Sequence, residues 1–234
     1  MAHFFNEILV YPLLNLLVYL YHFVPDIGIV ILLVTVVVRL VLLPSFHKSL
    51  KHQKAMTDLQ PKMNEIKEKY KDNKEQQAKA LMELYSVHKV NPMGSCLPLL
   101  IQLPILIALY QVFMQSLNGK ELLGLYAFVP RPEHINPMFL NIVDMTKPNI
   151  ILAAIAAALQ FLQSKMTLPK NTGAKDDMAA MMSKQMLYIF PIMTLFIGMK
   201  LPAGLAWYWL VTTLFGVAQQ YYIIRKEAKK LLAK

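Results

Sequence analysis

The sequence GIVILLVTVVVRLVLLP, residues 28–44, places Arg39 inside an otherwise apolar stretch. An apolar stretch of about this length predicts a helix that crosses a membrane. A charged side chain inside such a helix costs roughly 2.5–3.5 kcal/mol on insertion scales, so it normally faces protein or a watery cavity and marks a functional site. We favour a polar cavity around Arg39. The alternative is that Arg39, in the C-terminal half of the stretch, extends to the lipid headgroups.

The composition indicates a membrane protein. Hydrophobic residues make up 56% of the 234 residues and charged residues 16%, whereas soluble domains are about 25% charged. Long runs free of Asp, Glu, Lys and Arg lie between Lys89 and Lys120, Lys147 and Lys165, Lys184 and Lys200, and Lys200 and Arg225. With the Arg39 stretch, these runs predict an all-α integral membrane protein with five transmembrane helices at residues 28–46, 93–117, 148–165, 185–200 and 203–224.

The distribution of lysine and arginine predicts the orientation of these helices. Segments 47–92, 165–184 and 225–234 contain ten, four and five of these residues, whereas the remaining loops contain Lys120, Arg131, Lys147 and Lys200. Positive charge marks the cytoplasmic side of a membrane protein. We therefore expect the N-terminus outside, an extracytoplasmic loop at 118–147, a cytoplasmic loop at 166–184 and a basic cytoplasmic tail at 225–234. The net charge of +10 should attract anionic lipid and possible RNA partners to the cytoplasmic face.

The first 27 residues predict an amphipathic helix in the outer membrane interface. The apolar run lacks the basic start and cleavage signature of a signal peptide. His3, Asn6, Glu7, Asn15 and His22 fall on one half of a helical wheel, which is typical of a helix that lies in the interface. A sixth span is the alternative, and it would disturb the charge topology.

Residues 47–92 predict a cytoplasmic helical hairpin. The segment is lysine-rich, and apolar residues recur at heptad-like spacing at Met56, Leu59, Met63, Ile66 and Tyr70. A turn at 71–74 would join this helix to a second one with Leu81, Leu84 and His88 on its seam. We expect Pro61 to kink or break the first helix. A plain linker is the alternative, but sustained periodicity over such a length argues against it.

The sequence predicts no enzyme, metal or cofactor site. The single cysteine excludes an intrachain disulfide and a multi-cysteine metal site. No phosphate-binding loop, HExxH motif, membrane-embedded carboxylate pair or nucleophile with its base is present.

The predicted spans do contain amides and hydroxyls at helical spacing. Gln102, Gln111 and Gln115 fall in the second span, and Gln160 and Gln163 in the third. Trp209, Thr212, Gly216 and Gln219 or Gln220 form a stripe on the fifth, and Thr35 precedes Arg39 by one turn. A single amide more often joins helices, at an average of about 0.6 kcal/mol. An arginine without an acidic partner in any span, however, needs water or amides nearby, which indicates a hydrated groove.

Several ordered motifs resemble YidC-type membrane protein insertases, in the short form of the YidC/Oxa superfamily that has no large extracytoplasmic domain. They span essentially the whole chain: TVVVR (35–39), NPMGSCLPLLIQLPI (91–105), FLNIVDMTKP (139–148), Pro191, LPAGLAWYW (201–209) and QQY (219–221). The resemblance implies five helices around a hydrophilic groove that is open to the cytoplasm and to lipid and closed outside.

The resemblance also implies functional residues. Arg39 would be the groove arginine, with Thr35, Gln163 or the less favoured Gln160, Tyr208 and Trp209 beside it. The family motif would be built on Asn91, Pro92, Gly94, Pro98, Gln102, Pro104, Pro202 and Gly204. Implied partners are newly made membrane proteins and the lipid bilayer, with the ribosome, the signal recognition particle pathway and the Sec translocon as possible further ones. The implied location is the bacterial plasma membrane.

Two other function classes compete with an insertase. A small-anion secondary transporter would use Arg39 as an anion site, but such folds usually contain repeated halves and broken helices. The sequence contains no internal repeat, and five spans do not divide into halves. A membrane scaffold whose hairpin docks partners is the other alternative. Insertion of a single-span client into liposomes would separate the three.

Overall fold

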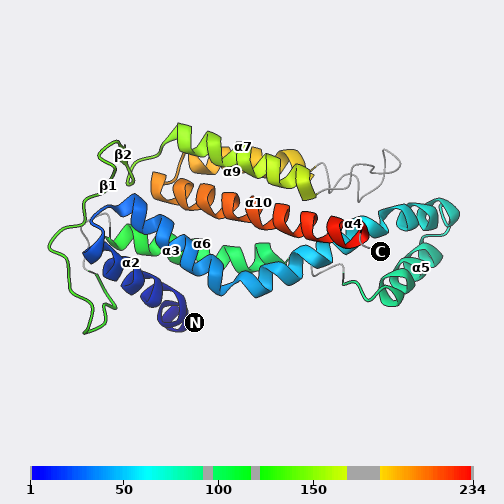
Figure 1. The fold of residues 1–234 in the computed structure, drawn as a ribbon, viewed down its shortest axis with the longest axis horizontal. Coiled ribbons are helices and arrows are strands. Elements are labelled where there is room, and N and C mark those ends of the chain that lie inside the picture. The colour runs from blue at the N-terminus through cyan, green and yellow to red at the C-terminus, as the bar shows by residue number, and fades with distance from the viewer. Residues whose placement is uncertain (1, 92–96, 117–121, 168–184, 233–234) are drawn as a thin grey trace.

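The computed structural model shows an elongated helical bundle with a helical hairpin projecting from one end (Figure 1). It describes residues 2–91, 97–116, 122–167, 185–232. The helices are α1 (Ala2–Phe5), η1 (Asn6–Val10), α2 (Tyr11–Phe23), α3 (Ile27–Val41), α4 (Leu43–Lys69), α5 (Lys74–Val87), α6 (Leu97–Ser116), α7 (Ile150–Thr167), η3 (Gln185–Ile189), α9 (Phe190–Gly198) and α10 (Ala203–Leu232), where η marks π-helical turns. A two-stranded sheet pairs β1 (Met138–Phe139) with β2 (Val143–Asp144).

We name the two ends of the bundle by what lies there. The loop end holds β1, β2 and the connections around them, and the hairpin end holds α4, α5 and the C-terminal part of α10 (Figure 1). Helix α10 lies centrally between these ends and packs against α7, α3, α6 and α9. Its charge-free part was predicted as residues 203–224, and the helix continues through most of the predicted basic tail.

Helix α3 begins and ends for identifiable reasons. The Asp26 side chain accepts a 3.0 Å hydrogen bond from the Ile29 amide and so caps the first turn. The helix ends at Val41, and α4 leaves at an angle of 66°. Pro44 stands in the first turn of α4, a position where its missing N–H costs little. The predicted span 28–46 therefore contains the end of α3 at Val41 and the start of α4 at Leu43.

Small residues let the helices next to α10 pack closely. An added Cβ at Gly198 would lie 2.8 Å from the Cβ of Ala153, which brings α9 against α7. Ala153, Ala156 and Ala206 are almost fully buried. Small side chains at such positions are typical of helix packing in membranes, where backbones approach one another closely.

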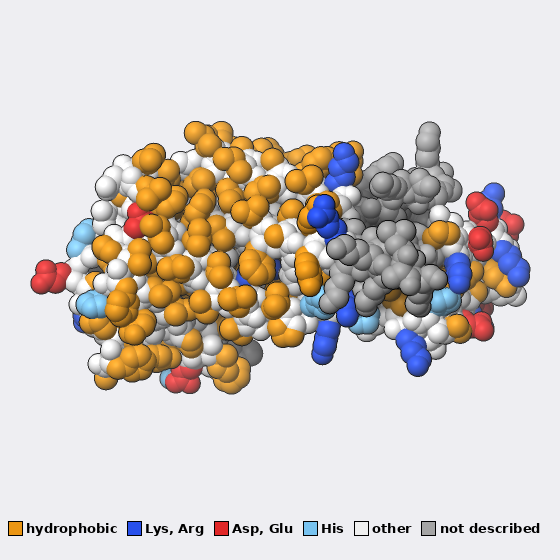
Figure 2. Space-filling view, viewed as in Figure 1, with side chains coloured by type: hydrophobic (Ala, Val, Ile, Leu, Met, Phe, Trp, Pro, Cys, Tyr) orange, Lys and Arg blue, Asp and Glu red, His pale blue; other side chains and the backbone are white. Residues whose placement is uncertain are grey.

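The outside of the bundle is apolar. Hydrophobic side chains cover much of the visible face of the bundle, and Lys and Arg side chains lie mainly toward the hairpin end (Figure 2). On α9, for example, Ile192, Met193 and Phe196 are 52%, 43% and 60% exposed. An apolar surface of this extent marks contact with lipid or protein.

Length and mean hydropathy alone identify fewer spans than the sequence analysis predicted. Within the part of the chain that the structure describes, His3–Phe23 is long and apolar enough to cross a membrane, and the bent pair α3 and α4 qualifies if counted as one span. Three further apolar helices are shorter, namely Leu100–Ser116, Ile150–Met166 and Leu187–Gly198. Aromatic, hydroxyl and amide side chains lower the hydropathy of α10.

The N-terminal helix is amphipathic in a different way from that predicted. It runs obliquely to the bundle (Figure 1) and buries an apolar face that includes Leu14 and Leu17. Asn15, predicted on the polar face, is buried: it donates to the Gly124 carbonyl and accepts from the Tyr126 amide, at 2.8 and 2.7 Å. The amide thus fastens α2 to the loop after α6. Whether this helix lies in the interface, as predicted, or spans the membrane stays a prediction.

The hairpin has the predicted two helices, and its predicted seam is buried at Leu59 and Met63 but not at His88, which is exposed. Leu59 and Met63 are buried between α4 and α5, and the Tyr85 hydroxyl contacts the Met63 sulfur at 3.8 Å. The Asn73 side chain caps α5 by accepting from the Gln76 amide. Of the expected kink or break at Pro61, the break was wrong, because α4 continues through this residue; the kink stays a prediction.

Aromatic packing closes the loop end. The Phe139 and Trp207 rings lie 5.0 Å apart, and the Trp207 indole donates a 2.9 Å hydrogen bond to the Gly28 carbonyl. The amides of Ala203 and Gly204 donate to the carbonyls of Lys147 and Met145. These contacts join the β1–β2 hairpin to the first turns of α3 and α10.

The turn between β1 and β2 is held by carboxylates. Leu140 and Asn141 have φ values of 50° and 58°, and the Leu140 amide donates a 2.7 Å bond to Asp26. At the end of β2, the Thr146 hydroxyl and then Lys147 hold the pKa of Asp144 below its usual range. Asp26 therefore both caps α3 and anchors the turn to it.

We predict that Gly28→Ala destabilises the closure of the loop end. A Cβ at this position would lie 2.1 Å from the Phe139 ring, so the ring must leave its place between Gly28 and Trp207. Overpacking of this kind costs about 1–3 kcal/mol. The thermal unfolding temperature in detergent should fall, and proteolysis of the loop should become faster. Ala154→Val, on an exposed part of α7, is the control; equal stability of the two variants would contradict a packed closure.

Candidate functional site

Arg39 is buried at the junction of three helices. Only 8% of the residue is exposed. Its Nε donates a 2.5 Å hydrogen bond to the Thr212 hydroxyl on α10, and its guanidinium lies 4.4 Å from the centre of the Phe46 ring on α4. A cation over an aromatic face is attracted by the ring quadrupole. The structure therefore buries the Arg39 side chain between helices rather than extending it to the surface of the bundle; the polar cavity around it stays a prediction.

Two more polar residues extend this cluster to α6. The Gln102 amide donates a 2.7 Å hydrogen bond to the Tyr208 hydroxyl, which also interacts with Thr212 and with Arg39. Tyr208 is 2% exposed. We call Gln102, Tyr208, Thr212 and Arg39 the arginine cluster. In this cluster, uncharged side chains on α6 and α10 connect to Arg39 on α3.

Among the residues that the structure describes, no ion pair joins Arg39 to a carboxylate. The sequence contains no Asp or Glu between Asp26 and Asp58, Glu83 and Glu121, Asp144 and Asp176, or Asp177 and Glu227. The guanidinium has five N–H donors, and Nε is the one that bonds to Thr212. The cluster can therefore attract an incoming negative charge, which an ion-paired arginine could not do as well.

A second polar cluster, which we call the Gln160 cluster, joins α7, α9 and α10. The Gln160 Oε1 atom accepts hydrogen bonds from the Thr194 hydroxyl at 2.5 Å and from the Trp209 indole at 3.0 Å. One carbonyl thus joins three helices. Gln160, which the sequence favoured less than Gln163, is thus in direct contact with Trp209.

Gln163 lies one turn further along α7 and packs over a glycine. An added Cβ at Gly216 would lie 2.3 Å from the Gln163 Nε2 atom, so a larger residue there would displace the amide.

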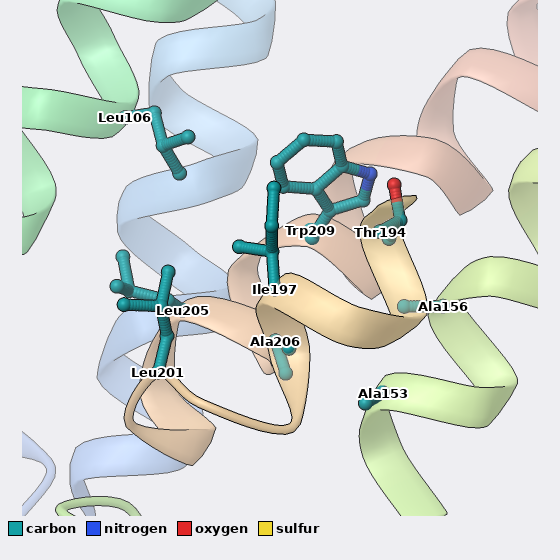
Figure 3. Close-up of a pocket in the computed structure, with 10 residues that line it drawn as sticks. Leu106, Ala153, Ala156, Thr194, Ile197, Leu201, Leu205, Ala206 and Trp209 are labelled. Carbon is teal, nitrogen blue, oxygen red and sulfur yellow. The ribbon is translucent and has the colours of Figure 1, made fainter. Parts of the chain in front are cut away.

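Between the Gln160 cluster and the loop end is a small apolar cavity of about 20 Å³ (Figure 3). Thr194 and Trp209 lie on one side of it and Ala153 on another, and its volume corresponds to about one water molecule.

Thr35 takes no direct part in either cluster. Its hydroxyl donates a 2.6 Å bond to the Ile31 carbonyl of its own helix, and the residue is 1% exposed. It lies one turn before Arg39 on α3, as predicted from the spacing.

Two contacts of these clusters were missed in the sequence. Thr194 is the one hydroxyl residue of α9, and its isolation in an apolar helix was a usable signal. Phe46 gave no signal, because its place under Arg39 depends on the 66° bend between α3 and α4.

The structure places the predicted motif residues in different elements. Pro98 and Pro104 lie within α6, Gln102 joins the arginine cluster, and Asn91 is exposed beyond α5. Pro202 directly precedes α10, and Gly204 lies in its first turn, where its amide donates to the Met145 carbonyl. Pro92 and Gly94 lie outside the described residues.

Comparison with known proteins identifies the family. The 60Kd inner membrane protein family matches residues 19–230. A membrane protein insertase YidC of Fusobacterium nucleatum is 38% identical over 206 residues, which are 88% of this chain and 90% of that protein. The chain belongs to this family. A YidC of Citrifermentans bemidjiense is 37% identical over 91% of this chain but only 36% of its own length, so the chain spans about a third of such relatives.

A solved structure supports the fold. The crystal structure of an active YidC insertase with its first transmembrane domain resolved matches with a TM-score of 0.65 and 30% identity, over 93% of this chain and 46% of that one. The predicted helical, multi-span membrane fold is confirmed by these matches. The roles of individual residues stay predictions.

We predict that the Gln160 cluster stabilises the bundle as one unit. Thr194→Val and Trp209→Phe should each cost about 0.6 kcal/mol and at most about 1.7 kcal/mol, the range of hydrogen bonds between membrane helices. In a Gln160→Leu background, the Thr194→Val change should cost nothing further. Denaturant unfolding in bicelles would give the coupling energy. Thr213→Val is the control, because Thr213 bonds to the Trp209 carbonyl of its own helix. Strict additivity in the Thr194–Gln160 pair would contradict the shared bond.

Proposed function

We propose that this YidC-family chain is a membrane protein insertase, which helps hydrophobic client segments move from the cytoplasm into the lipid bilayer. The observation that carries this proposal is the arginine cluster: a buried cation between three helices whose partner is the hydroxyl of Thr212 rather than a carboxylate. Such a site is costly in an apolar bundle, and its charge is available to a client.

The energetics favour partitioning rather than a covalent reaction. Transfer of about 20 apolar residues of a client from water into lipid is strongly favourable. The barrier is the passage of the client's polar outer tail through hydrocarbon. A hydrated groove around Arg39 shortens the dry part of that path, and Arg39 pairs transiently with acidic residues of the tail. A membrane potential adds about 2.3 kcal/mol per charge per 100 mV.

The proposal includes an orientation. The hairpin end is cytoplasmic, because the lysine-rich segment 47–92 and the basic C-terminal segment lie there, and the loop end faces outward. Support comes from the closure of the loop end by Phe139 and Trp207. The clients are membrane proteins, and the location is the bacterial plasma membrane.

We predict that Arg39→Ala reduces insertion of clients with acidic outer tails by roughly ten- to a hundredfold, because a hydrogen bond to a charged group contributes about 1.5–3 kcal/mol. Arg39→Lys should retain much of the activity. The measurement is the insertion rate into liposomes for paired clients that differ only in acidic or neutral tails. A neutral-tailed client is the control and should be affected less. Equal losses for both tails would assign Arg39 a purely structural role.

The hairpin is proposed to recruit clients or the machinery that delivers them. Its apolar seam is buried at Leu59 and Met63, so its outer surface is free to carry charge. Lys71 and Lys74 at the turn are exposed, and so are Met82 and Val87 on α5. Ribosomes and targeting factors are partners of suitable charge, and long-range attraction would raise their rate of encounter.

We predict that the double variant Lys71→Glu, Lys74→Glu lowers client crosslinking at early times. The stability of the protein and the packing of its core should stay the same. The effect should weaken at high salt, since exposed charges are screened. Adding Asp72→Lys and Glu83→Lys, both on exposed hairpin positions, restores the net charge and should restore crosslinking. If the charge-restored variant stays defective, specific contacts rather than charge govern recruitment.

A further inference from the structure

The polar face of α10 continues past the arginine cluster toward the hairpin end. Spacings of four, four and three residues place Tyr208, Thr212, Gly216 and Gln219 on one face of the helix. The first three serve partners on other helices, since Gln102 bonds to Tyr208, Arg39 bonds to Thr212, and Gln163 packs over Gly216.

Gln219 differs from the other members of this face. Its Nε2 atom is buried, and the residues that the structure describes supply no hydrogen-bond acceptor for it. A buried donor without a partner costs about 1–3 kcal/mol, and such exceptions in folded proteins call for an explanation. A leucine would fill similar space without this cost. The N–H groups of Gln219 are therefore suited to bind a ligand that supplies a hydrogen-bond acceptor.

The position of Gln219 indicates when a client would meet it. Helix α10 starts at the loop end with Ala203, and Gln219 lies seven residues beyond Thr212. At 1.5 Å per residue, this is about 10 Å closer to the hairpin end. A client that enters from the hairpin end passes Gln219 before its tail reaches Arg39.

We propose that Gln219 is a client-binding residue whose Nε2 donates hydrogen bonds to backbone carbonyl oxygens of the entering segment. This inference rests on the proposed insertase function. A segment that has not yet formed its helix has unpaired carbonyls, and each costs several kcal/mol where water is scarce. Every client has such carbonyls, so an amide donor serves clients of any sequence. Arg39 in contrast discriminates between clients by charge.

The two residues therefore have different signatures. We expect Gln219→Leu to lower the insertion rate about three- to tenfold for acidic-tailed and neutral-tailed clients alike. The stability of the variant in detergent should equal or exceed that of the wild type, because an unpartnered buried donor is removed. Gln219→Glu replaces the donor with an acceptor and should be at least as defective, whereas Gln219→Asn keeps a donor and should retain part of the activity.

Gln115 offers a matched control. It is an amide near the loop-end terminus of α6 whose buried Oε1 atom also lacks a partner among the described residues, but it presents an acceptor. Gln115→Leu should insert clients at the wild-type rate.

In a Cys96→Ser background, Gln219→Cys should form disulfides with single cysteines of the client at early times, before the client's tail has crossed.

The outcomes separate this inference from the function on which it rests. If the wild type inserts no client, the proposed function fails. If the wild type inserts clients and Gln219→Leu does so equally fast, Gln219 does not bind clients. A loss of activity with a parallel loss of stability, or without disulfides to the client, would also overturn the inference and assign Gln219 to packing or to water.

Discussion

One unpaired cation determines how the centre of this protein is arranged. Arg39 lies in an apolar helix, and no acidic residue lies in the neighbouring charge-free segments. Neutral groups must therefore stabilise it, and they come from other helices: the Thr212 hydroxyl directly and Tyr208 beside it. A carboxylate in their place would form an ion pair and cancel the charge that a client could use. The requirement for neutral partners thus links packing of α3, α6 and α10 to the proposed function.

The two ends of the bundle solve different physical problems. The loop end is closed by apolar groups, with Met145 completely buried and Phe139 packed on Trp207. Backbone carbonyls there are satisfied by the Trp207 indole and by amides of α10. The hairpin end instead carries the lysine-rich helices. In the proposed orientation, this asymmetry would give a direction of entry, because the lysine-rich end would attract polar chain segments while the described part of the loop end is packed with apolar groups.

The sequence predicted the helices better than it predicted their junctions. Charge-free runs located α6, α7 and α9 and the start of α10 to within a few residues, because helices in an apolar environment exclude charged side chains. They did not locate the end of α10, which continues into the basic segment. The heptad-like spacing of apolar residues predicted the burial of Leu59 and Met63, because residues at this spacing share one face of a helix. The 66° bend after Val41 and the contact between Phe46 and Arg39 depend on how two helices meet. Likewise, spacing alone could not show that Gln160 accepts a hydrogen bond from the Trp209 indole.

Helix length adds a constraint that the polar clusters help to explain. α7 has 18 residues, about 27 Å of helix, and η3 with α9 spans 14 residues, about 21 Å. The hydrocarbon core of a bilayer is about 30 Å thick, so lipid beside these helices has to thin or the flanking lysines have to extend outward. The Gln160 cluster holds this short pair against α10. On the proposed function, this short pair would stand next to the polar clusters, where a client's polar tail would have less hydrocarbon to cross.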